Sequence, residues 1–511
     1  MAVQPWAEAG VVLVSVATVA VGSLGLRRAR TTGDFYVASR AVTPAWNAAA
    51  VSGEYLSAAS FLGIAGLVLT HGFDMLWYPV GYTAGYLILL ALVAAPLRRS
   101  AAYTLPDFAQ IRLGSTVVRR TASLLVVLIG WLYLVPQLQG AALALTAQTG
   151  APGWAGGLIV CGVVLTTVAV GGMRSITFAQ AVQYWLKLTA LLVPAVVLGA
   201  VWHGRHDRLP ASADTGWLDP LGSGLDHPLY VSLSLIVAIC LGTMGLPHVL
   251  VRFYTNPDGR NARRTALIVI VLLSVFYQLP TLFGVFGRRY LPELAGTRFA
   301  DATVLLLPER MLGGLPGELL GSLVTAGAFA AFLSTASGLT VSVAGVLSQD
   351  LLGRRAPLAQ RRQRIRAFRA AAVLSLAVPY ALSLVGARVS LAAMVGLAFA
   401  LAACTFCPLL VLGIWWRGLT AVGAMAGLVV GGVLAGFAVL TTLVVAPQRG
   451  WTGALLAQPA AWIVPLTFAT MLGVSLATRS RIPAGVGRVL VRLHVPESMI
   501  AELPSIDRSS G

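Results

Sequence analysis

Apolar stretches long enough to cross a lipid bilayer recur along the whole sequence, and they constrain the fold more than any other feature. Of the 511 residues, 57% are hydrophobic and 11% are charged, whereas about a quarter of the residues in soluble domains are charged. A helix of about 20 apolar residues crosses a hydrocarbon core about 30 Å thick. The sequence therefore predicts an all-α integral membrane protein. About thirteen transmembrane helices are predicted, at residues 8–26, 45–70, 75–96, 121–147, 153–171, 176–201, 229–250, 265–287, 317–346, 370–387, 389–415, 420–446 and 461–478.

The net charge of +18 follows the predicted topology and does not indicate a nucleic-acid partner. The basic residues lie in short clusters between the apolar stretches, without a basic domain rich in aromatic residues. Alternate loops on one side hold 27 arginines and those on the other side hold eight. Because short, positively charged loops stay in the cytoplasm, the N-terminus is predicted outside and the C-terminus in the cytoplasm. The almost exclusive use of arginine, with Lys187 as the single lysine, suggests a GC-rich genome and hence a bacterial plasma membrane.

The second predicted span is interrupted by a small polar segment, Ser52–Ser60, which contains Glu54. Glu54 falls near the middle of the bilayer, where an ionisable side chain is costly and usually marks a substrate or ion pathway. The seventh span is interrupted in the same way at Gly242–His248. Paired interruptions in two halves of a chain indicate an inverted-repeat transporter with its site at the breaks, although glycine also permits close helix packing.

Substrate contacts are predicted at or opposite these two breaks, because freed backbone groups there face a cavity rather than lipid. Backbone N–H groups at the starts of half-helices suit a small anion. The residues predicted to line the cavity are Tyr55, Ser57, Gln137, Thr243 and Gly245. His248, just after the second break, is predicted to be a hydrogen-bonded structural histidine rather than a proton relay.

The ninth span carries adjacent hydroxyl groups on Ser334 and Thr335. Together with carbonyls one turn earlier they offer several hard oxygen ligands to a small cation. Hydroxyl groups in membrane helices more often bond the carbonyl four residues before them. A cation site therefore needs further ligands, and the carbonyls freed around Gly53 are the candidates.

Lys187 and Glu54 are the two intramembrane charges that stand out in the sequence. Lys187 falls near mid-depth of the sixth span, too far from the interface to reach it comfortably. The two side chains have opposite signs, so they are predicted to lie close together, or Lys187 to face the substrate carboxylate.

No catalytic chemistry is predicted. The sequence lacks a nucleophile–base constellation, a glycine-rich phosphate loop and a His/Cys metal cluster. Cys404 and Cys407 have the spacing of a redox pair but lie inside an apolar stretch. The protein is predicted not to be an enzyme and to need no cofactor.

Four stretches resemble the sodium/solute symporter family, in particular its acetate and short monocarboxylate permease branch. They follow one another in the order of the family and extend over most of the chain. The stretches are Asp34–Arg40, Gly53–Gly63, Gly242–Phe253 and Ala331–Thr335.

The resemblance implies a single transporter domain, 1–511, with a leucine-transporter-like core of five plus five helices. The repeats are expected at about 45–201 and 229–415, with peripheral helices 8–26, 420–446 and 461–478. The family's sodium site maps onto the carbonyls of Gly53, Leu56 and Ala331 and the hydroxyls of Ser334 and Thr335. Two positions depart from the family: Glu54 replaces the branch's usual Asp, and Gln180 stands where sugar and proline members have Asp.

The predicted function is sodium-coupled uptake of acetate or another short monocarboxylate by alternating access. The expected partners are the monocarboxylate, Na⁺ or H⁺, and the lipid bilayer. Two alternatives remain open. One is cation-coupled symport of a different small solute, such as an amino acid or a sugar, and the other is a transporter-like membrane sensor.

Overall fold

The computed structural model describes residues 5–24, 42–207, 215–222, 224–352, 361–385, 389–445, 449–497 and 499. Within these ranges the regular structure is entirely helical, so the predicted all-α class is confirmed. The first half contains α1 (Pro5–Leu24), α3 (Pro44–Tyr55), α4 (Ile64–His71), α5 (Trp77–Leu92), α6 (Ala94–Arg99), α7 (Leu105–Leu113), α8 (Thr116–Thr149) and α9 (Gly153–Gly204). The second half contains α10 (Thr215–Leu218), α11 (Pro228–Thr243), α12 (Pro247–Phe253), α13 (Gly259–Tyr290), α14 (Thr303–Leu312), α15 (Gly314–Val346), α16 (Arg361–Ser383), α17 (Leu391–Trp415), α18 (Ala421–Val444), α19 (Gly450–Ala457), α20 (Ala460–Ala477) and α21 (Val486–His494).

Nine helices in the described part of the chain are long and apolar enough to cross a membrane, and the bent pair α11–α12 brings the number to ten. The number thirteen therefore stays a prediction. The predicted spans 153–171 and 176–201 belong to one helical element, α9. The segment Asp34–Arg40, which contributes to the family resemblance, lies outside the described residues.

Two helices near the centre of the molecule are interrupted. α3 ends at Tyr55, and the chain resumes with a π-helical turn, Ala59–Gly63, that continues into α4. α11 ends at Thr243 and α12 begins at Pro247, with a bend of 40° between them. Pro247 occupies the first turn of α12, where its missing N–H has no intrahelical partner to lose. The breaks thus fall in both polar interruptions that the sequence contains.

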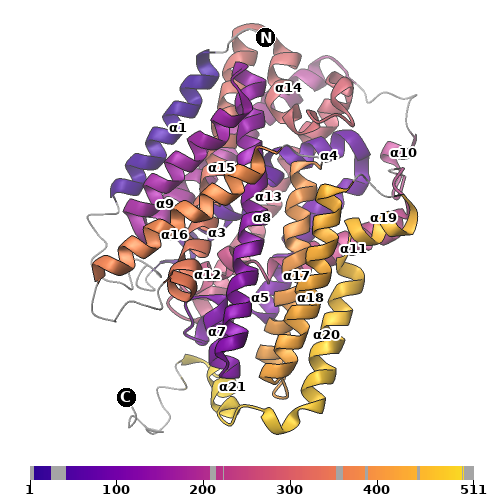
Figure 1. Ribbon diagram of the computed structural model, residues 1–511. Helices are drawn as coiled ribbons and strands as arrows, with labels where there is room; N and C mark the ends of the chain where they lie inside the picture. The colour runs from indigo at the N-terminus through magenta and orange to yellow at the C-terminus, as the bar shows by residue number, and fades with distance from the viewer. Residues whose placement is uncertain are drawn as a thin grey trace.

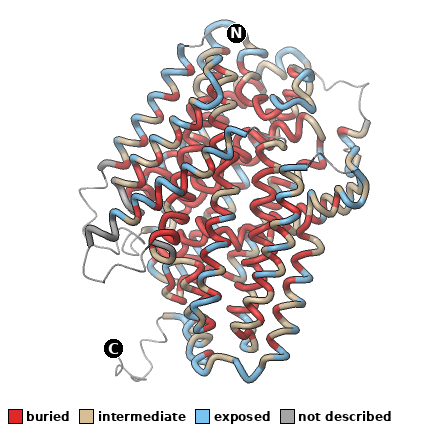
Figure 2. The backbone as a smooth tube through the Cα atoms, in the orientation of Figure 1, coloured by how far each residue is buried: buried red, intermediate tan, exposed pale blue. Residues whose placement is uncertain are grey.

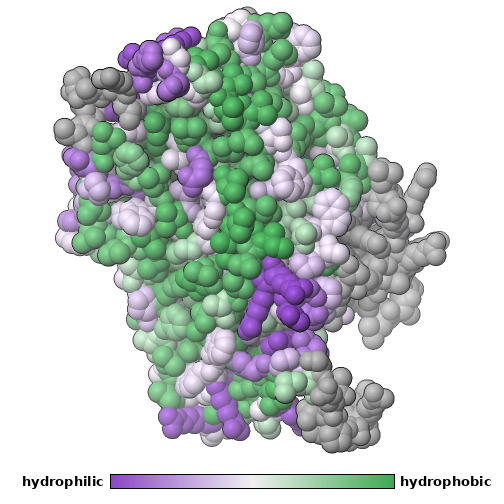
Figure 3. Space-filling model, turned by 180° about the vertical axis from the view of Figure 1, so that it is seen from behind, coloured by the Kyte–Doolittle hydropathy of each residue, from purple (hydrophilic) through white to green (hydrophobic). Residues whose placement is uncertain are grey.

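The helices form an elongated bundle with the described N-terminal end and α14 towards one end and α21 towards the other (Figure 1). Buried residues concentrate along the middle of the bundle, and exposed residues follow its outer helices and both ends (Figure 2). α15 and α17 are largely buried, whereas α1, α18 and α20 are mostly accessible. On the face drawn in Figure 3, hydrophobic side chains cover the middle and hydrophilic ones gather towards the ends. This distribution is the one expected of a protein surrounded by lipid hydrocarbon.

Candidate functional site

The two breaks meet side by side through a hydrogen bond between Tyr55 and Thr243. The Tyr55 hydroxyl lies 2.9 Å from Thr243 Oγ1, and Thr243 in turn donates to the carbonyl of Ile239 at 2.8 Å. The Tyr55 hydroxyl also donates to the carbonyl of Tyr82 at 3.5 Å. Gly245, between α11 and α12, has its backbone close to α17, since a Cβ there would lie 2.7 Å from the carbonyl of Ala402. Gly245 thus permits close approach of the second break to α17.

Gln137 of α8 satisfies the backbone at the first break. Its Oε1 accepts a hydrogen bond from the N–H of Ala58 at 2.8 Å, and its Nε2 donates to the carbonyl of Tyr133 at 3.2 Å. Ser57 lies buried beside this contact. Gln137 therefore lies at the first break, and both ends of its amide are bonded to backbone groups; its contact with substrate stays a prediction.

Aromatic side chains surround the junction of the breaks. The Tyr55 ring packs edge to face on Tyr86 and Tyr82 of α5, with centroid distances of 4.9 and 5.7 Å. Tyr82 also stacks on Tyr277 of α13 at 5.5 Å and lies 5.2 Å from Phe399 of α17. These rings come from four different helices, so the junction is enclosed rather than open to lipid.

Several buried polar atoms of this enclosure have no hydrogen-bond partner among the residues that the structure describes. They include the hydroxyl oxygens of Tyr82 and Tyr86 and both ring nitrogens of His248. The His248 ring packs edge to face on Tyr133, with a centroid distance of 5.1 Å. The hydrogen bond expected for His248 is not found among the described residues. A buried polar group without a partner is costly.

The side chain of Lys187 lies among the oxygens that the sequence assigns to the cation. Its Nζ donates to the carbonyl of Gly53, to the carbonyl of Leu56 at 2.8 Å and to Ser334 Oγ at 2.5 Å. Ser334 Oγ also lies 3.0 Å from the carbonyl of Ala331. Thr335 Oγ1 donates to the carbonyl of Glu54 at 2.6 Å. The Lys187 amine thus contacts three of the five predicted ligands, Gly53, Leu56 and Ser334, and a fourth, the carbonyl of Ala331, is bonded to Ser334.

Glu54 forms its ion pair with Arg252 of α12. Arg252 Nε lies 2.6 Å from Glu54 Oε2, and both side chains are only 2% exposed. The same guanidinium donates to Thr177 Oγ1 at 2.6 Å and to Gln180 Oε1, both on α9. Gln180 Nε2 then donates to the carbonyl of Ser334 at 2.8 Å. Lys187 bonds the carbonyl of Gly53, the residue before Glu54, so the two charged residues lie close together, which is one of the two predicted arrangements, but no direct ion pair between them is found among the described residues.

Both departures from the family pattern belong to this network. The longer side chain of Glu54 reaches Arg252, and the neutral Gln180 accepts from Arg252 while donating to α15. Gly338 of α15 leaves room for the carboxylate, since a Cβ at Gly338 would overlap it. Arg252 itself was missed because it was counted with the cytoplasmic loop arginines. Its position nine residues after Thr243, within the Gly242–Phe253 stretch, was the available signal.

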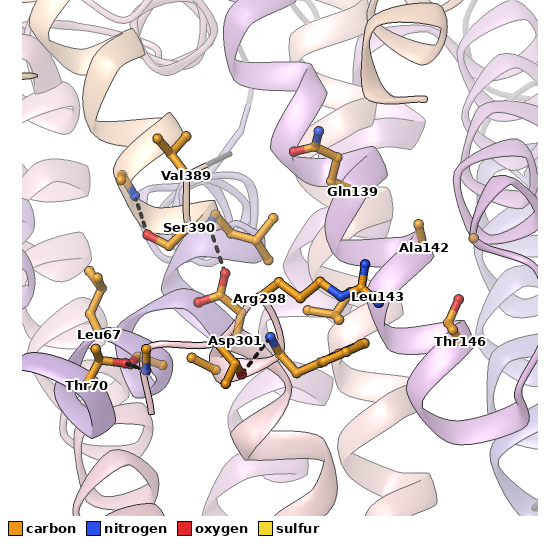
Figure 4. A pocket seen from close by; sticks show the side chains of 18 of the residues that line it. Leu67, Thr70, Gln139, Ala142, Leu143, Thr146, Arg298, Asp301, Val389 and Ser390 are labelled. Atoms are coloured by element: carbon orange, nitrogen blue, oxygen red, sulfur yellow. Dashed lines mark hydrogen bonds between the residues drawn. The ribbon is translucent and has the colours of Figure 1, made fainter. Parts of the chain in front are cut away.

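A pocket of about 830 Å³ lies between α4, α8, the segment before α14 and the start of α17. Leu67 and Thr70 of α4, Gln139 and Thr146 of α8, and the segment before α14 line it (Figure 4). Arg298 extends across the pocket towards α8 (Figure 4). Asp301 Oδ2 accepts from the N–H of Leu391 at the start of α17, at 2.9 Å. Burial raises the pKa of Asp301 to about 6, against the opposing effect of this hydrogen bond.

Known proteins of similar fold and sequence cover most of the chain. A sodium-coupled sialic acid symporter, solved in a substrate-bound outward-open state, superposes with a TM-score of 0.70 over 91% of this chain and 97% of the symporter, at 16% identity. A nucleobase-cation-symport-1 family transporter in a closed conformation with bromovinylhydantoin bound superposes with a TM-score of 0.54. The superposition covers 91% of this chain and 99% of that transporter, at 14% identity. The predicted leucine-transporter-like fold is thereby confirmed.

Two relatives are similar in sequence. The uncharacterized symporter YwcA of Bacillus subtilis (strain 168) is 32% identical over 425 residues, which are 81% of this chain and 82% of YwcA. A monocarboxylic acid transporter of Corynebacterium glutamicum is 28% identical over 497 residues, which are 91% of this chain and 88% of that protein. The sequence model of the sodium:solute symporter family matches residues 35–431. The chain therefore belongs to the sodium:solute symporter family and is a membrane transporter, not an enzyme.

Proposed function

We propose that this protein is a cation-coupled symporter that takes up short-chain monocarboxylates across a bacterial plasma membrane. The observation that carries the proposal is the enclosed junction of the two breaks, where Tyr82, Tyr86 and His248 present buried polar atoms without partners in the described structure. Tyrosine hydroxyls and a histidine N–H donate hydrogen bonds to a carboxylate. The surrounding aromatic rings suit a short hydrocarbon chain.

The positions of the charged groups support a small anion rather than a large polar solute. Arg252, the guanidinium nearest the junction in sequence, is paired with Glu54. A carboxylate would therefore be held by neutral donors, which cost less to desolvate than a second ion pair. The C. glutamicum relative, named as a monocarboxylic acid transporter, supports the same class of substrate.

In the proposed cycle the two breaks open and close the site in turn. The Tyr55–Thr243 hydrogen bond joins the breaks, and separating them would open the enclosure on one side. With the N-terminus outside, as the arginine distribution predicts, the 830 Å³ pocket is the entrance from the outside. Its Arg298 would attract an approaching anion.

Counterflow in proteoliposomes tests the substrate class without any ion gradient. Vesicles loaded with unlabelled pyruvate should take up labelled pyruvate from outside, and acetate and propionate should compete with it. Proline and glucose should compete at least tenfold more weakly, because the enclosure offers few polar groups to pair with the amino group of proline or the additional hydroxyl groups of glucose. Protein-free vesicles are the control. Equal competition by proline or glucose would contradict the proposed substrate class.

A further inference from the structure

Lys187 fills the coordination site that the sequence assigned to sodium. An ammonium group has three N–H donors, and the three contacts of Nζ use all of them on Gly53, Leu56 and Ser334. Gly53 lies in the last turn of α3, Leu56 follows at its C-terminal cap, and Ser334 belongs to α15. The lysine thus joins the same two elements that a bound sodium ion would join.

The remaining oxygens of the site are also engaged. Ser334 Oγ, which accepts from Lys187, lies 2.7 Å from the carbonyl of Gly53 and 3.0 Å from that of Ala331. The Thr335 hydroxyl donates its proton to the carbonyl of Glu54. A sodium ion at these ligands would compete with the ammonium for the same oxygens and would be repelled by its charge. The side chain is 0% exposed, so water does not screen that repulsion.

We propose that Lys187 is the resident cation of this site, and that the proton on its amine replaces sodium as the coupling ion. The inference rests on the proposed symport function and names its driving ion. It differs from the expectation drawn from the sequence, in which Na⁺ occupies these ligands.

The proton step balances without another reactant. With the site accessible from outside, the nitrogen lone pair of neutral Lys187 takes a proton from water and forms the third N–H bond. The ammonium then holds the break of α3 against α15, and the carboxylate binds at the neighbouring junction. With the site accessible from inside, the proton returns to water and the anion leaves. One proton and one monocarboxylate enter together, so no net charge is moved.

Lysine can perform this step and the neighbouring cation cannot. A guanidinium such as that of Arg252 does not release its proton in proteins, whereas a lysine amine does. The neutral amine keeps two donors and loses its charge. Deprotonation therefore weakens the link between α3 and α15 and permits the first break to move.

The titratable groups that face Lys187 from the packed elements are already partnered or lie towards the substrate enclosure. From α3 and α12, Glu54 and Arg252 form their own pair, and His248 faces the aromatic enclosure. On α9 itself the Tyr184 hydroxyl donates to the carbonyl of Leu272 at 3.1 Å. α15 contributes the hydroxyls of Ser334 and Thr335 to the site, which do not titrate. Lys187 is accordingly the group to vary.

The wild-type protein provides the first test. Proteoliposomes in sodium-free choline medium, given an inside-alkaline pH gradient, should accumulate labelled pyruvate about tenfold per unit of pH difference, as one-to-one proton symport requires. Replacing external choline by sodium at the same pH should change nothing. Pyruvate is used because it is a stronger acid than acetate, so that less of it is present as the neutral form that crosses lipid. Protein-free vesicles measure the remaining leak. Accumulation that requires an inward sodium gradient would overturn the proposal.

Variants at Lys187 provide the second test. Lys187→Arg keeps a positive charge but cannot release a proton, so accumulation should fall to the level of protein-free vesicles. Thr167→Val is the matched control on α9, because its hydroxyl bonds the carbonyls of Val163 and Val164 in its own helix. Monodisperse elution shows whether each variant is folded. A folded Lys187→Arg that still accumulates pyruvate with the pH gradient would overturn the proposal, and if it does not fold, the wild-type measurement decides.

The two proposals fail in different ways. Absence of pyruvate counterflow in the wild type, measured without any gradient, would contradict the monocarboxylate function. Counterflow together with sodium-driven accumulation would leave that function intact and contradict only the role of Lys187.

Discussion

At the residue scale, the centre of the protein depends on a buried Glu54–Arg252 pair. Each side chain is 2% exposed, and Arg252 also binds Thr177 and Gln180. Removing one member of such a pair leaves an uncompensated buried charge, which costs about 3–5 kcal/mol, whereas removing both is often far milder.

A double-mutant cycle tests this assignment. Glu54→Gln and Arg252→Met should each lower the folded yield and the midpoint of thermal unfolding in detergent, and the double variant should recover most of the loss. The matched cycle combines Glu54→Gln with Lys187→Met. The losses of folded yield and thermal stability from these two substitutions should be closer to additive, because Lys187 binds three oxygens that do not belong to the Glu54 side chain. Stronger coupling to Lys187 than to Arg252 would contradict the contacts described above.

The sequence predicted which residues meet but not how they pair. Glu54, Lys187, Ser334 and Thr335 stood out because each is polar at mid-depth. The packing of α3, α9, α12 and α15 sets the directions of the side chains, and these directions determine which basic residue pairs with Glu54. A 3.6-residue period places a residue on a face of its helix but does not say which neighbour covers that face. The sequence therefore offered Lys187 as a partner for the Glu54 carboxylate, whereas the Lys187 amine binds the carbonyls of Gly53 and Leu56.

At the element scale, breaks in two helices create the site, and both were visible as polar, glycine-containing interruptions. The sequence did not reveal that Gln137 would bind the N–H of Ala58. That contact joins residues 79 positions apart, and nothing in the local pattern of α8 distinguishes a residue that binds substrate from one that satisfies a broken helix.

The connection between the start of α17 and the segment before α14 should depend on pH. Burial raises the pKa of Asp301 to about 6, above an unfolded value of about 3.9. Between these values the folded protein binds more protons than the unfolded protein, so stability decreases as pH rises through this interval. Asp301→Asn removes the titrating group.

Thermal unfolding in detergent from pH 4 to 7 measures the effect. The midpoint of the wild type, relative to that of Asp301→Asn, should decline as the pH rises from about 4 to about 6, and should level off above that interval. Curves that run parallel across this range would show that Asp301 titrates normally in the folded protein.

At the scale of the whole molecule, composition alone predicted a membrane protein, and family membership now confirms it as a transporter. The number of spans and the division into repeats at 45–201 and 229–415 stay predictions. They depend on where helices bend and join, which apolar length alone does not determine. The arginine distribution makes a separate prediction about orientation.

Cysteine labelling at the two ends of α8 tests that orientation. Thr116 and Thr149 are the first and last residues of this 34-residue helix, which is long enough to cross the bilayer. In a Cys161→Ala background, Thr149→Cys should react with a membrane-impermeant maleimide on intact cells, and Thr116→Cys should react only after permeabilisation. The reverse pattern would place the N-terminus in the cytoplasm and make the pocket an inner one.

The most direct test of the account is to count the ions that enter with the substrate. Wild-type proteoliposomes in medium containing radioactive sodium at uniform concentration are given labelled pyruvate and an internal pH indicator. The account predicts that pyruvate entry acidifies the interior by about one proton per molecule, without sodium uptake above that of protein-free vesicles. Sodium entering in fixed ratio to pyruvate, with no acidification, would contradict the assignment of Lys187 as the resident cation.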